Sequence, residues 1–376
     1  MARPSGDKTF GKTYSELYKD SIGYTGNFSR LSPYTAGSFS VSYISFTTMF
    51  GKFKPNEVSQ TFKTFGENRV IISERLGAQN PNSTGKDPDG YYQGYNRYNQ
   101  EVIIPAFLAA YTKKDPYSVA LIKQQNPNIK SNPFSGIFPK PNWRISYNGL
   151  TRIPGMEKIF SNFTVTHAYN STLSMNSYNS SLLYDDYGTN YSAFLDTLTG
   201  NFIPYFLVPN VTISEAFAPL LDVDVQLTNQ VSAKFEYRKS RQLSLSLVDF
   251  QVSEARSTEF TVGAGWRKRG FPLPFKIKLP GKKGAASKKL ENDINFRLDF
   301  SVRDDATSNS RLDQDASLPT AGQKVITISP SIDYVLNNRL NIKLYFDQRR
   351  TEPKISTSTP ITTTRAGVQI RISLAQ

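Results

Sequence analysis

The chain has 376 residues and no cysteine, which excludes disulfides, thiolate nucleophiles and zinc–thiolate sites. Its formal charge is +14 at pH 7, but the basic residues are scattered and no nucleic-acid-binding motif accompanies them, so we expect no nucleic-acid partner. If the chain forms a membrane barrel, a basic lumen, or basic loops facing lipopolysaccharide or transported cargo, explains the excess of positive charge. The longest apolar run, residues 102–111, is about half of a membrane helix, so any membrane crossing must use strands.

The N-terminal region, residues 1–54, begins with a polar lead and then predicts strands around residues 22–30 and 38–50. Met1 is followed by ARPSGDKTFGK, which has no apolar core and no cleavage site and is therefore not a secretory signal. An outer-membrane protein needs such a signal. Either the chain is cytoplasmic, or it is a mature or partial chain, a fragment cut from a longer precursor, and the strand pattern favours the second.

Residues 55–142 predict a helical insert. Apolar residues at helical spacing run to Gly77, a C-terminal cap signal, and are Val58, Phe62, Phe65, Ile72 and Leu76. EVIIPAFLAAY and the pair Asp115–Pro116 predict two short helices, and a proline-rich connector ends the insert. Because helical pieces do not face lipid beside an open sheet, we expect an extramembrane lid, plug or docking element. A helical layer on a soluble sheet is the alternative.

Residues 143–376 predict antiparallel strands. These include NWRISYNGL, two polar strands at residues 163–172 and 173–183, and alternating segments at 221–227, 231–237, 243–247 and 260–266. Four further strands follow, at 294–302, 326–336, 340–346 and 366–374. The pattern predicts tight turns at 228–230 and 337–338 and long connections at 267–289 and 305–324. Pro330, inside a regular strand, indicates a bulge or a sheet edge.

The strict period of two in these strands predicts one apolar and one polar face. A strand of about ten residues, tilted by about 40°, spans about 25 Å, the height of the apolar band of an outer-membrane barrel. We expect the following side chains to face a watery lumen: Lys234, Glu236, Arg297, Asp299, Arg303, Lys343, Asp347 and Arg371. Their apolar counterparts should face lipid: Phe235, Trp266, Phe296, Leu298, Phe300, Ile328, Leu344 and Ile370.

No pattern predicts a catalytic, cofactor or metal site. His167, the only histidine, has no acidic partner at metal spacing and is expected to be half-buried in a strand. Adjacent Asp185 and Asp186 point apart on an extended chain and lack an EF-hand spacing. The glycines of TVGAGWRKRG precede no helix, so they indicate a bulge or a close neighbour rather than a phosphate loop. We expect neither enzymatic activity nor a cofactor.

Several long strings resemble one known family. KLENDINFRLDFSVRDD, TAGQKVITISPSIDYVLNNRLNIKLYFDQRRTEPKISTS and RAGVQIRISLAQ are similar to the C-terminal end of the SprA/Sov family, and VTISEAFAPLLDVDVQLTNQVSAKFEYRKSRQLSLSL, PNWRISYNGL and EVIIPAFLAAYTKKD look like earlier parts of it. Its members are outer-membrane translocons of the type IX secretion system and gliding-motility proteins of Bacteroidetes. The resemblance covers most of the chain from about residue 56.

The resemblance implies a wall segment of a very large transmembrane β-barrel in a Gram-negative outer membrane. Its expected partners are outer-membrane lipid and lipopolysaccharide, secreted cargo bearing a C-terminal sorting domain, and the shuttle barrel and plug proteins of the secretion machinery. Two alternatives remain open. One is a self-contained outer-membrane porin or transporter of about 10–14 strands. The other is a soluble or surface-attached β-sandwich that binds or adheres.

Overall fold

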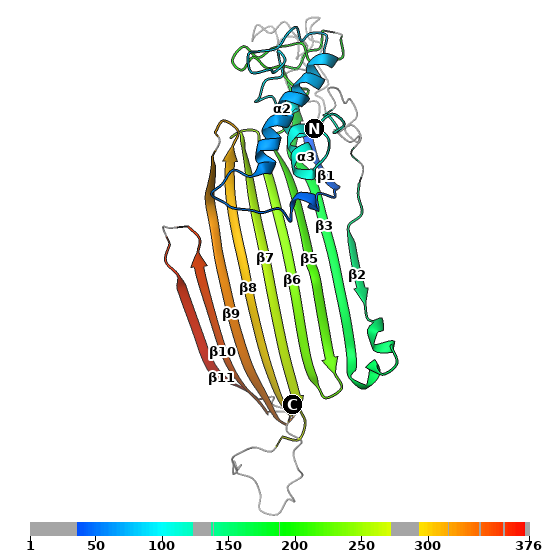
Figure 1. Ribbon diagram of the computed structural model, residues 1–376. Helices are drawn as coiled ribbons and strands as arrows, with labels where there is room; N and C mark the ends of the chain where they lie inside the picture. The colour runs from blue at the N-terminus through cyan, green and yellow to red at the C-terminus, as the bar shows by residue number, and fades with distance from the viewer. Residues whose placement is uncertain are drawn as a thin grey trace, which may run out of the picture.

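The computed structural model describes residues 36–122, 137, 139–187, 189–271, 293–314, 316–337, 340–355 and 358–372. Antiparallel strands form one open sheet of eleven strands, and two α-helices pack against one end of it (Figure 1). The main path runs β1-β3-β5-β6-β7-β8-β9-β10-β11, while β2 and β4 each pair with β3. The predicted all-β class is confirmed at this level.

The long strands are joined mainly as successive hairpins. Their bounds are β3 (Phe160–Ser180), β5 (Asn210–Leu227), β6 (Val231–Ser246), β7 (Gln251–Lys268), β8 (Asp293–Arg311), β9 (Ser317–Asn337), β10 (Leu340–Pro353) and β11 (Ile361–Ile372). The short strands are β1 (Ala36–Ser42), β2 (Trp143–Tyr147) and β4 (Phe206–Leu207). The described residues also contain 3₁₀ turns at Phe46–Thr48, Gly149–Arg152 and Met156–Lys158.

Several predicted strand boundaries are wrong in the same way, because the strands are longer than their apolar runs. Residues 163–183 belong largely to β3, one continuous strand, and the segments at 231–237 and 243–247 are both parts of β6. The predicted long connection at 305–324 is mostly strand, since β8 reaches Arg311 and β9 begins at Ser317. Polar residues can continue a strand wherever its backbone pairs on both sides.

The predictions for turns and proline give mixed results. The tight turn at residues 228–230 is confirmed between β5 and β6. The predicted strand at 22–30, most of the predicted loop at 267–289 and Asn338 lie outside the described residues. Pro330 is neither at an edge nor at a bulge: β9 is an interior strand, Pro330 pairs with Leu298, and no register shift occurs there. On the β10 side, the ladder pairing is interrupted between Tyr345 and Gln348, opposite Pro330. Proline has no backbone N–H to donate to the neighbouring strand, which explains the interruption.

The helical layer consists of α2 (Gln60–Gln79) and α3 (Gln100–Thr112). The Ser59 hydroxyl caps α2 and the Asn99 side chain caps α3, and both accept a backbone N–H of the first turn. All residues of α3 after Gln100 are buried, because it lies between α2 and the sheet. The predicted helix at Asp115–Pro116 is wrong, because the chain makes only a single turn there. The Asp115 carboxylate accepts the N–H of Tyr117, and the Asp115 carbonyl accepts the N–H groups of Ser118 and Val119.

Gly77 does not end α2, as its position in the sequence indicated. It lies inside the helix, and a Cβ there would sit 2.2 Å from the ring of Tyr92. The glycine therefore admits a close neighbour rather than terminating the helix.

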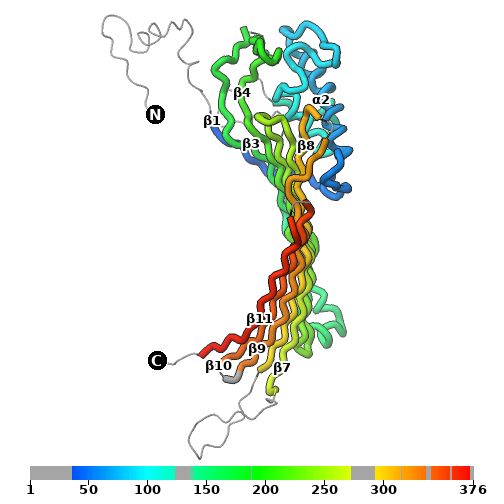
Figure 2. Tube along the Cα trace, turned by 90° about the vertical axis from the view of Figure 1, so that its left-hand side faces the viewer, coloured from blue at the N-terminus to red at the C-terminus, as the bar shows by residue number. Residues whose placement is uncertain are grey.

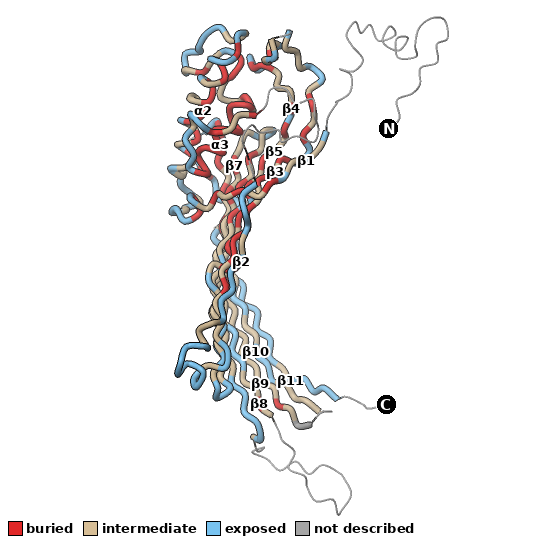
Figure 3. The backbone as a smooth tube through the Cα atoms, turned by 90° about the vertical axis from the view of Figure 1, so that its right-hand side faces the viewer, coloured by how far each residue is buried: buried red, intermediate tan, exposed pale blue. Residues whose placement is uncertain are grey.

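Residues 43–59, here called the strap, cross the upper end of the sheet and connect β1 to α2 (Figure 1). The main core lies between the helices and this end of the sheet, where buried residues gather in Figure 3. It joins Phe65, Ile72 and Phe107 of the helices to Ile213 and Leu243 of the sheet. Lower down, most strand residues are intermediate or exposed and only a few, such as Ile294 and Tyr334, are buried, so the sheet extends well beyond its helical cover.

The sheet bends along its strands, and α2 lies on its convex side (Figure 2). Register shifts interrupt β5 between Phe217 and Leu221 and β3 between Thr166 and Asn170, at the level where the strap crosses. Extra residues in one strand of a pair bend it and increase its twist. Among the described residues, no helix combines the length and the apolar composition that crossing a membrane requires.

We expect Leu108→Ala, in the buried α3, to lower the free energy of unfolding by about 2–5 kcal/mol, since it removes packed methyl groups and leaves a cavity. Leu198→Ala makes the same chemical change at a side chain that is 94% exposed and should shift stability by less than about 0.5 kcal/mol. Denaturant unfolding of the refolded chain measures both. Equal losses would contradict this account of the core.

Candidate functional site

The two faces of the sheet are the most distinctive feature of the molecule. Directly paired residues of antiparallel strands share a face, so the register assigns each side chain. Lys234 pairs with Gly263, which pairs with Asp299, and Asp333 pairs with Lys343. Following the ladders in this way puts all eight predicted lumen-facing residues on one face: Lys234, Glu236, Arg297, Asp299, Arg303, Lys343, Asp347 and Arg371.

The opposite face carries the eight predicted lipid-facing residues. One row runs Phe235, Val262, Phe300 and Ile328, and a second runs Trp266, Phe296, Ile332, Leu344 and Val368. Leu298 lies between these rows, and Ile370 pairs with Ile342 below them. We call the uncharged area spanned by these rows the apolar band. Whether the band contacts lipid stays a prediction.

Most of the apolar band is not covered by other described residues. Leu298 is 43% exposed and Ile370 is 60% exposed, although both are large aliphatic side chains. Trp266, Leu344, Phe346 and Val368 are exposed as well. A continuous apolar surface of this kind on a folded protein marks a contact with another molecule or with lipid.

Aromatic rings lie at both ends of the apolar band. At the lower end the rings of Trp266 and Phe296 stack with centroids 5.4 Å apart. At the upper end Phe46, Tyr169 and Phe217 form an edge-packed cluster, with centroids 4.7–5.9 Å apart. Aromatic rings have an apolar body and a polar rim or handle, so they collect where an apolar zone meets a wet one.

Above the apolar band, the same face turns charged. We call these residues the charged belt: Lys239, Asp304, Lys324, Arg350, Glu352 and Lys354. Lys354 forms an ion pair with Asp304, and Arg350 lies 2.8 Å from Glu352. The strap and helices pack beyond this level. The sequence of zones on this one face is therefore apolar band, charged belt and helical cover.

A buried ion pair joins the strap to the sheet. Glu215 of β5 and Arg241 of β6 pair across neighbouring strands, with Arg241 Nε donating to Glu215 Oε1 at 2.6 Å. The Ser45 hydroxyl of the strap donates to the other carboxylate oxygen of Glu215 at 2.5 Å, and Arg241 donates to the Ser45 carbonyl. Both charged side chains are almost fully buried. Each charge is thus paired and hydrogen-bonded, as burial requires.

A second arginine holds the next part of the strap. Arg256 of β7 donates to the carbonyls of Met49 and Gly51 at 3.1 and 2.7 Å and pairs with Glu254 at 2.6 Å. The Thr48 hydroxyl donates to the carbonyl of Tyr111 and so caps the end of α3. Burial raises the pKa of the Tyr111 phenol, and the nearby Glu254 carboxylate adds to that rise. We call Glu215, Arg241, Glu254 and Arg256 the strap lock.

The strap lock was not predicted from the sequence, although the residue pattern contains a signal for it. Glu215, Arg241 and Glu254 occupy positions of the apolar parity, between Ile213, Leu243 and Val252. A charge at such a position predicts either a strand end or a buried partner. The partner that distinguishes these possibilities, Ser45, lies 170 residues from Glu215 in sequence.

The polar face carries nearly equal numbers of basic and acidic residues. The basic ones on β6–β11 are Lys234, Arg238, Arg267, Arg297, Arg303, Arg311, Lys343, Arg349, Arg365 and Arg371. The acidic ones on β5–β10 are Asp222, Asp224, Glu236, Glu259, Asp293, Asp299, Asp305, Asp333 and Asp347. Many pair locally, such as Glu236 with Lys234 and Arg238. The chain's basic excess therefore lies outside this face.

The remaining sequence candidates take structural positions. His167 is half-buried in β3, as expected, and its Nδ1–H donates to the Leu220 carbonyl at 2.7 Å in the bulged region. Asp185 and Asp186 lie in a loop, and the described residues contain no group of three acidic or histidine side chains that could hold a metal ion. Gly265 lies in a regular ladder, where a Cβ would sit 2.5 Å from the Ser232 hydroxyl.

Comparison with known proteins identifies no relative: no family model matches the chain, and no curated protein matches it. The geometry of the sheet is therefore the basis for assigning a function.

Glu215→Gln should lower the free energy of unfolding by about 3–5 kcal/mol, because it leaves the Arg241 guanidinium buried without a counter-charge. The exposed pair Lys54–Glu57 offers a control, and Glu57→Gln should cost less than about 1 kcal/mol. Adding Arg241→Met to Glu215→Gln should restore much of the loss, since both charges are then gone. Denaturant titration measures the free energy of unfolding of all three variants. If Glu215→Gln leaves this free energy unchanged, the buried ion pair does not hold the strap in place.

Proposed function

We propose that this chain forms part of the wall of a protein-conducting channel in a bacterial outer membrane. The observation that carries the proposal is the apolar band, an uncharged surface across several strands with a charged face directly behind it. Hydrocarbon on one side and water on the other would satisfy both faces. Placed in lipid instead, each Arg or Lys of the polar face would cost about 2–4 kcal/mol at the bilayer midplane.

The length and borders of the apolar band support the same proposal. On β8 the apolar residues run from Ile294 to Val302, nine residues by number, which rise roughly 30 Å along the strand and less across a membrane once the strand tilts. The two end rows carry a cation on another strand, Lys268 opposite Ile294 and Arg350 in the row of Val302, so the rows between them are the uncharged ones. Trp266 and Phe296 at the lower end lie as the interfacial girdle of a membrane barrel would, whereas the aromatic cluster at the upper end is buried under the strap. The charged belt then begins where lipid headgroups and water would start.

The open sheet favours a wall segment over a self-contained porin. A closed barrel needs its edge strands to pair with each other, because free edges expose backbone groups that lipid cannot satisfy. Among the described residues, β11 pairs only with β10, and β1 and β2 pair only with β3. Further strands from the same protein or from another chain would complete the wall. The resemblance to the type IX translocons offers that arrangement in a very large barrel.

The polar face supports passage of folded protein cargo rather than selection of a small ion. Basic and acidic side chains are interleaved on it, and some pair directly, as in the Lys234–Glu236–Arg238 triplet and the Arg303–Asp305 pair. A wall of this kind presents no strong field of one sign, so it would bind neither acidic nor basic cargo tightly. In this proposal the protein has no catalytic step, and transport of secreted and gliding-motility proteins follows from shape.

The helical insert supports a role outside the lumen. It packs on the face of the apolar band and above it, whereas a plug would lie against the polar face. We therefore assign it to an extramembrane collar that could contact lipid headgroups or partner proteins of the secretion machinery. A soluble sandwich has less support, because no second layer covers the apolar band among the described residues.

Leu298→Arg or Ile370→Arg should prevent insertion of the refolded chain into lipid vesicles, since each puts a guanidinium into the apolar band. Ser301→Arg, on the polar face of the same strand as Leu298, is the matched control and should insert normally. Flotation with vesicles and protection from protease measure insertion. Equal behaviour of the three variants, or recovery of the wild-type chain as a soluble monomer without detergent, would overturn the proposal.

A further inference from the structure

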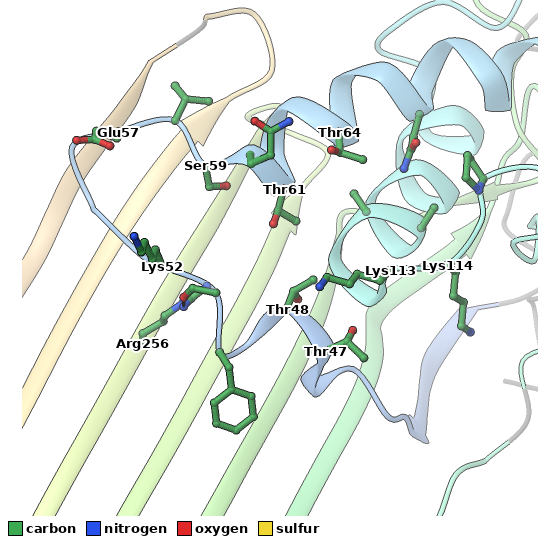
Figure 4. Close-up of a pocket in the computed structure, with 18 of the residues that line it drawn as sticks. Thr47, Thr48, Lys52, Glu57, Ser59, Thr61, Thr64, Lys113, Lys114 and Arg256 are labelled. Atoms are coloured by element: carbon green, nitrogen blue, oxygen red, sulfur yellow. Dashed lines mark hydrogen bonds between the residues drawn. The ribbon is translucent and has the colours of Figure 1, made fainter.

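A cleft of about 1020 Å³ lies between the strap and the two helices (Figure 4). The strap forms one wall, the first turns of α2 form the roof, and the end of α3 forms the other wall. Among its lining residues, basic side chains outnumber acidic ones: Lys52, Lys54, Lys113, Lys114 and Arg256 against Glu57 and Asp115. The cleft is thus a concave, positively charged site.

Two of these cations have no protein partner among the described residues, namely Lys52 of the strap and Lys113 after α3. The others are engaged: Lys54 pairs with Glu57 at 2.8 Å, Lys114 lies over the Tyr43 ring, and Arg256 belongs to the strap lock. Lys113 adopts a left-handed conformation at the C-cap of α3, and in Figure 4 its side chain extends toward the strap. A bound anion would give both free ammonium groups a counter-charge.

Hydroxyl groups supply further donors. Thr61 and Thr64 line the cleft from the first turns of α2 and point into it in Figure 4, and neither hydroxyl bonds to another described residue. Thr47 and Thr48 are occupied, since they donate to the carbonyls that end α3. Free ammonium and hydroxyl donors that line one cleft are groups of the kind that binds phosphate oxygens.

The position of the cleft indicates where that phosphate comes from. Its lining residue Phe50 packs on Phe217, at the upper end of the apolar band. Arg256, another lining residue, precedes Phe260 of the band by four positions on β7, roughly 13 Å along the strand. An amphiphile whose headgroup occupies the cleft can therefore lay its acyl chains over the apolar band of the same face.

We propose that this cleft binds the phosphate group of an anionic lipid and so fixes the height of the sheet in the membrane. The inference rests on the proposed function, because it takes the apolar band as the surface for the acyl chains. Lys52 and Lys113 carry the charge recognition, and Thr61 and Thr64 add hydrogen bonds.

The test uses the full chain in detergent micelles, so that lipid binding is measured independently of membrane insertion. Phosphatidic acid is titrated in and its binding is followed by native mass spectrometry, with phosphatidylcholine as the weakly binding reference. The double variant Lys52→Gln/Lys113→Gln should bind phosphatidic acid about 25-fold more weakly, or about fivefold per lysine removed. Lys63→Gln/Lys140→Gln removes the same charge from exposed positions that do not line the cleft and should bind within about twofold of wild type.

Each outcome decides the inference. Equal loss in the two double variants, or no loss in either, would overturn it, and far-UV circular dichroism checks that both variants are folded. Inorganic phosphate should not displace the lipid at matching concentrations, because it has no acyl chains to contact the apolar band. Displacement would assign the cleft to a free anion and contradict the lipid. Failure of the proposed function would instead appear as wild-type chain that binds lipid in micelles but does not enter vesicles.

Discussion

Alternate residues of a strand point to opposite faces of its sheet, and in this protein that geometry produces two faces of different chemical composition along eight long strands. One face is uncharged over the height of the apolar band, and the other carries interleaved basic and acidic residues. Neither face can change alone, because a shift of one residue in any register would exchange them. The length of the strands, the paired charges and the free apolar surface all depend on this separation.

The strap lock lets the same face serve two purposes. In the lower part of the sheet that face is apolar and open, whereas in the upper part it must bind polar backbone from the strap and from the end of α3. Glu215 and Arg241 make the change of character possible, since their charges are buried only where Ser45 supplies hydrogen bonds. The register shifts in β3 and β5 lie at the same level, where the sheet bends with its helical cover on the convex side.

Local pattern was enough to predict the two faces and most of the strands. Phe296, Leu298 and Phe300 alternate with Arg297 and Asp299, and period two has only one structural solution in a paired sheet. The helix α3 was equally clear from its uninterrupted apolar run. These features need only neighbours in sequence.

Features that depend on distant partners were not predictable. Lys239 and Arg241 interrupt the apolar pattern of β6 and seemed to divide it, yet their partners are Phe50 of the strap and Glu215 of β5. Gly77 was interpreted as a helix end because glycine is common there. The actual reason for the glycine is the ring of Tyr92, which belongs to a later loop and leaves no room for a Cβ. The cleft combines the strap, the start of α2 and the end of α3, so no single motif announced it.

The absence of cysteine permits a direct test of the separation of environments, because a label can be placed at any single position. Single cysteines at residues 296–303 of β8, labelled with a fluorophore after reconstitution in vesicles, can be quenched from either phase. We predict strong quenching by a lipid-phase quencher at the apolar positions Phe296, Leu298, Phe300 and Val302. An aqueous quencher should act strongly at the alternate positions Arg297, Asp299, Ser301 and Arg303. Equal quenching at neighbouring positions, or the reverse alternation, would contradict it.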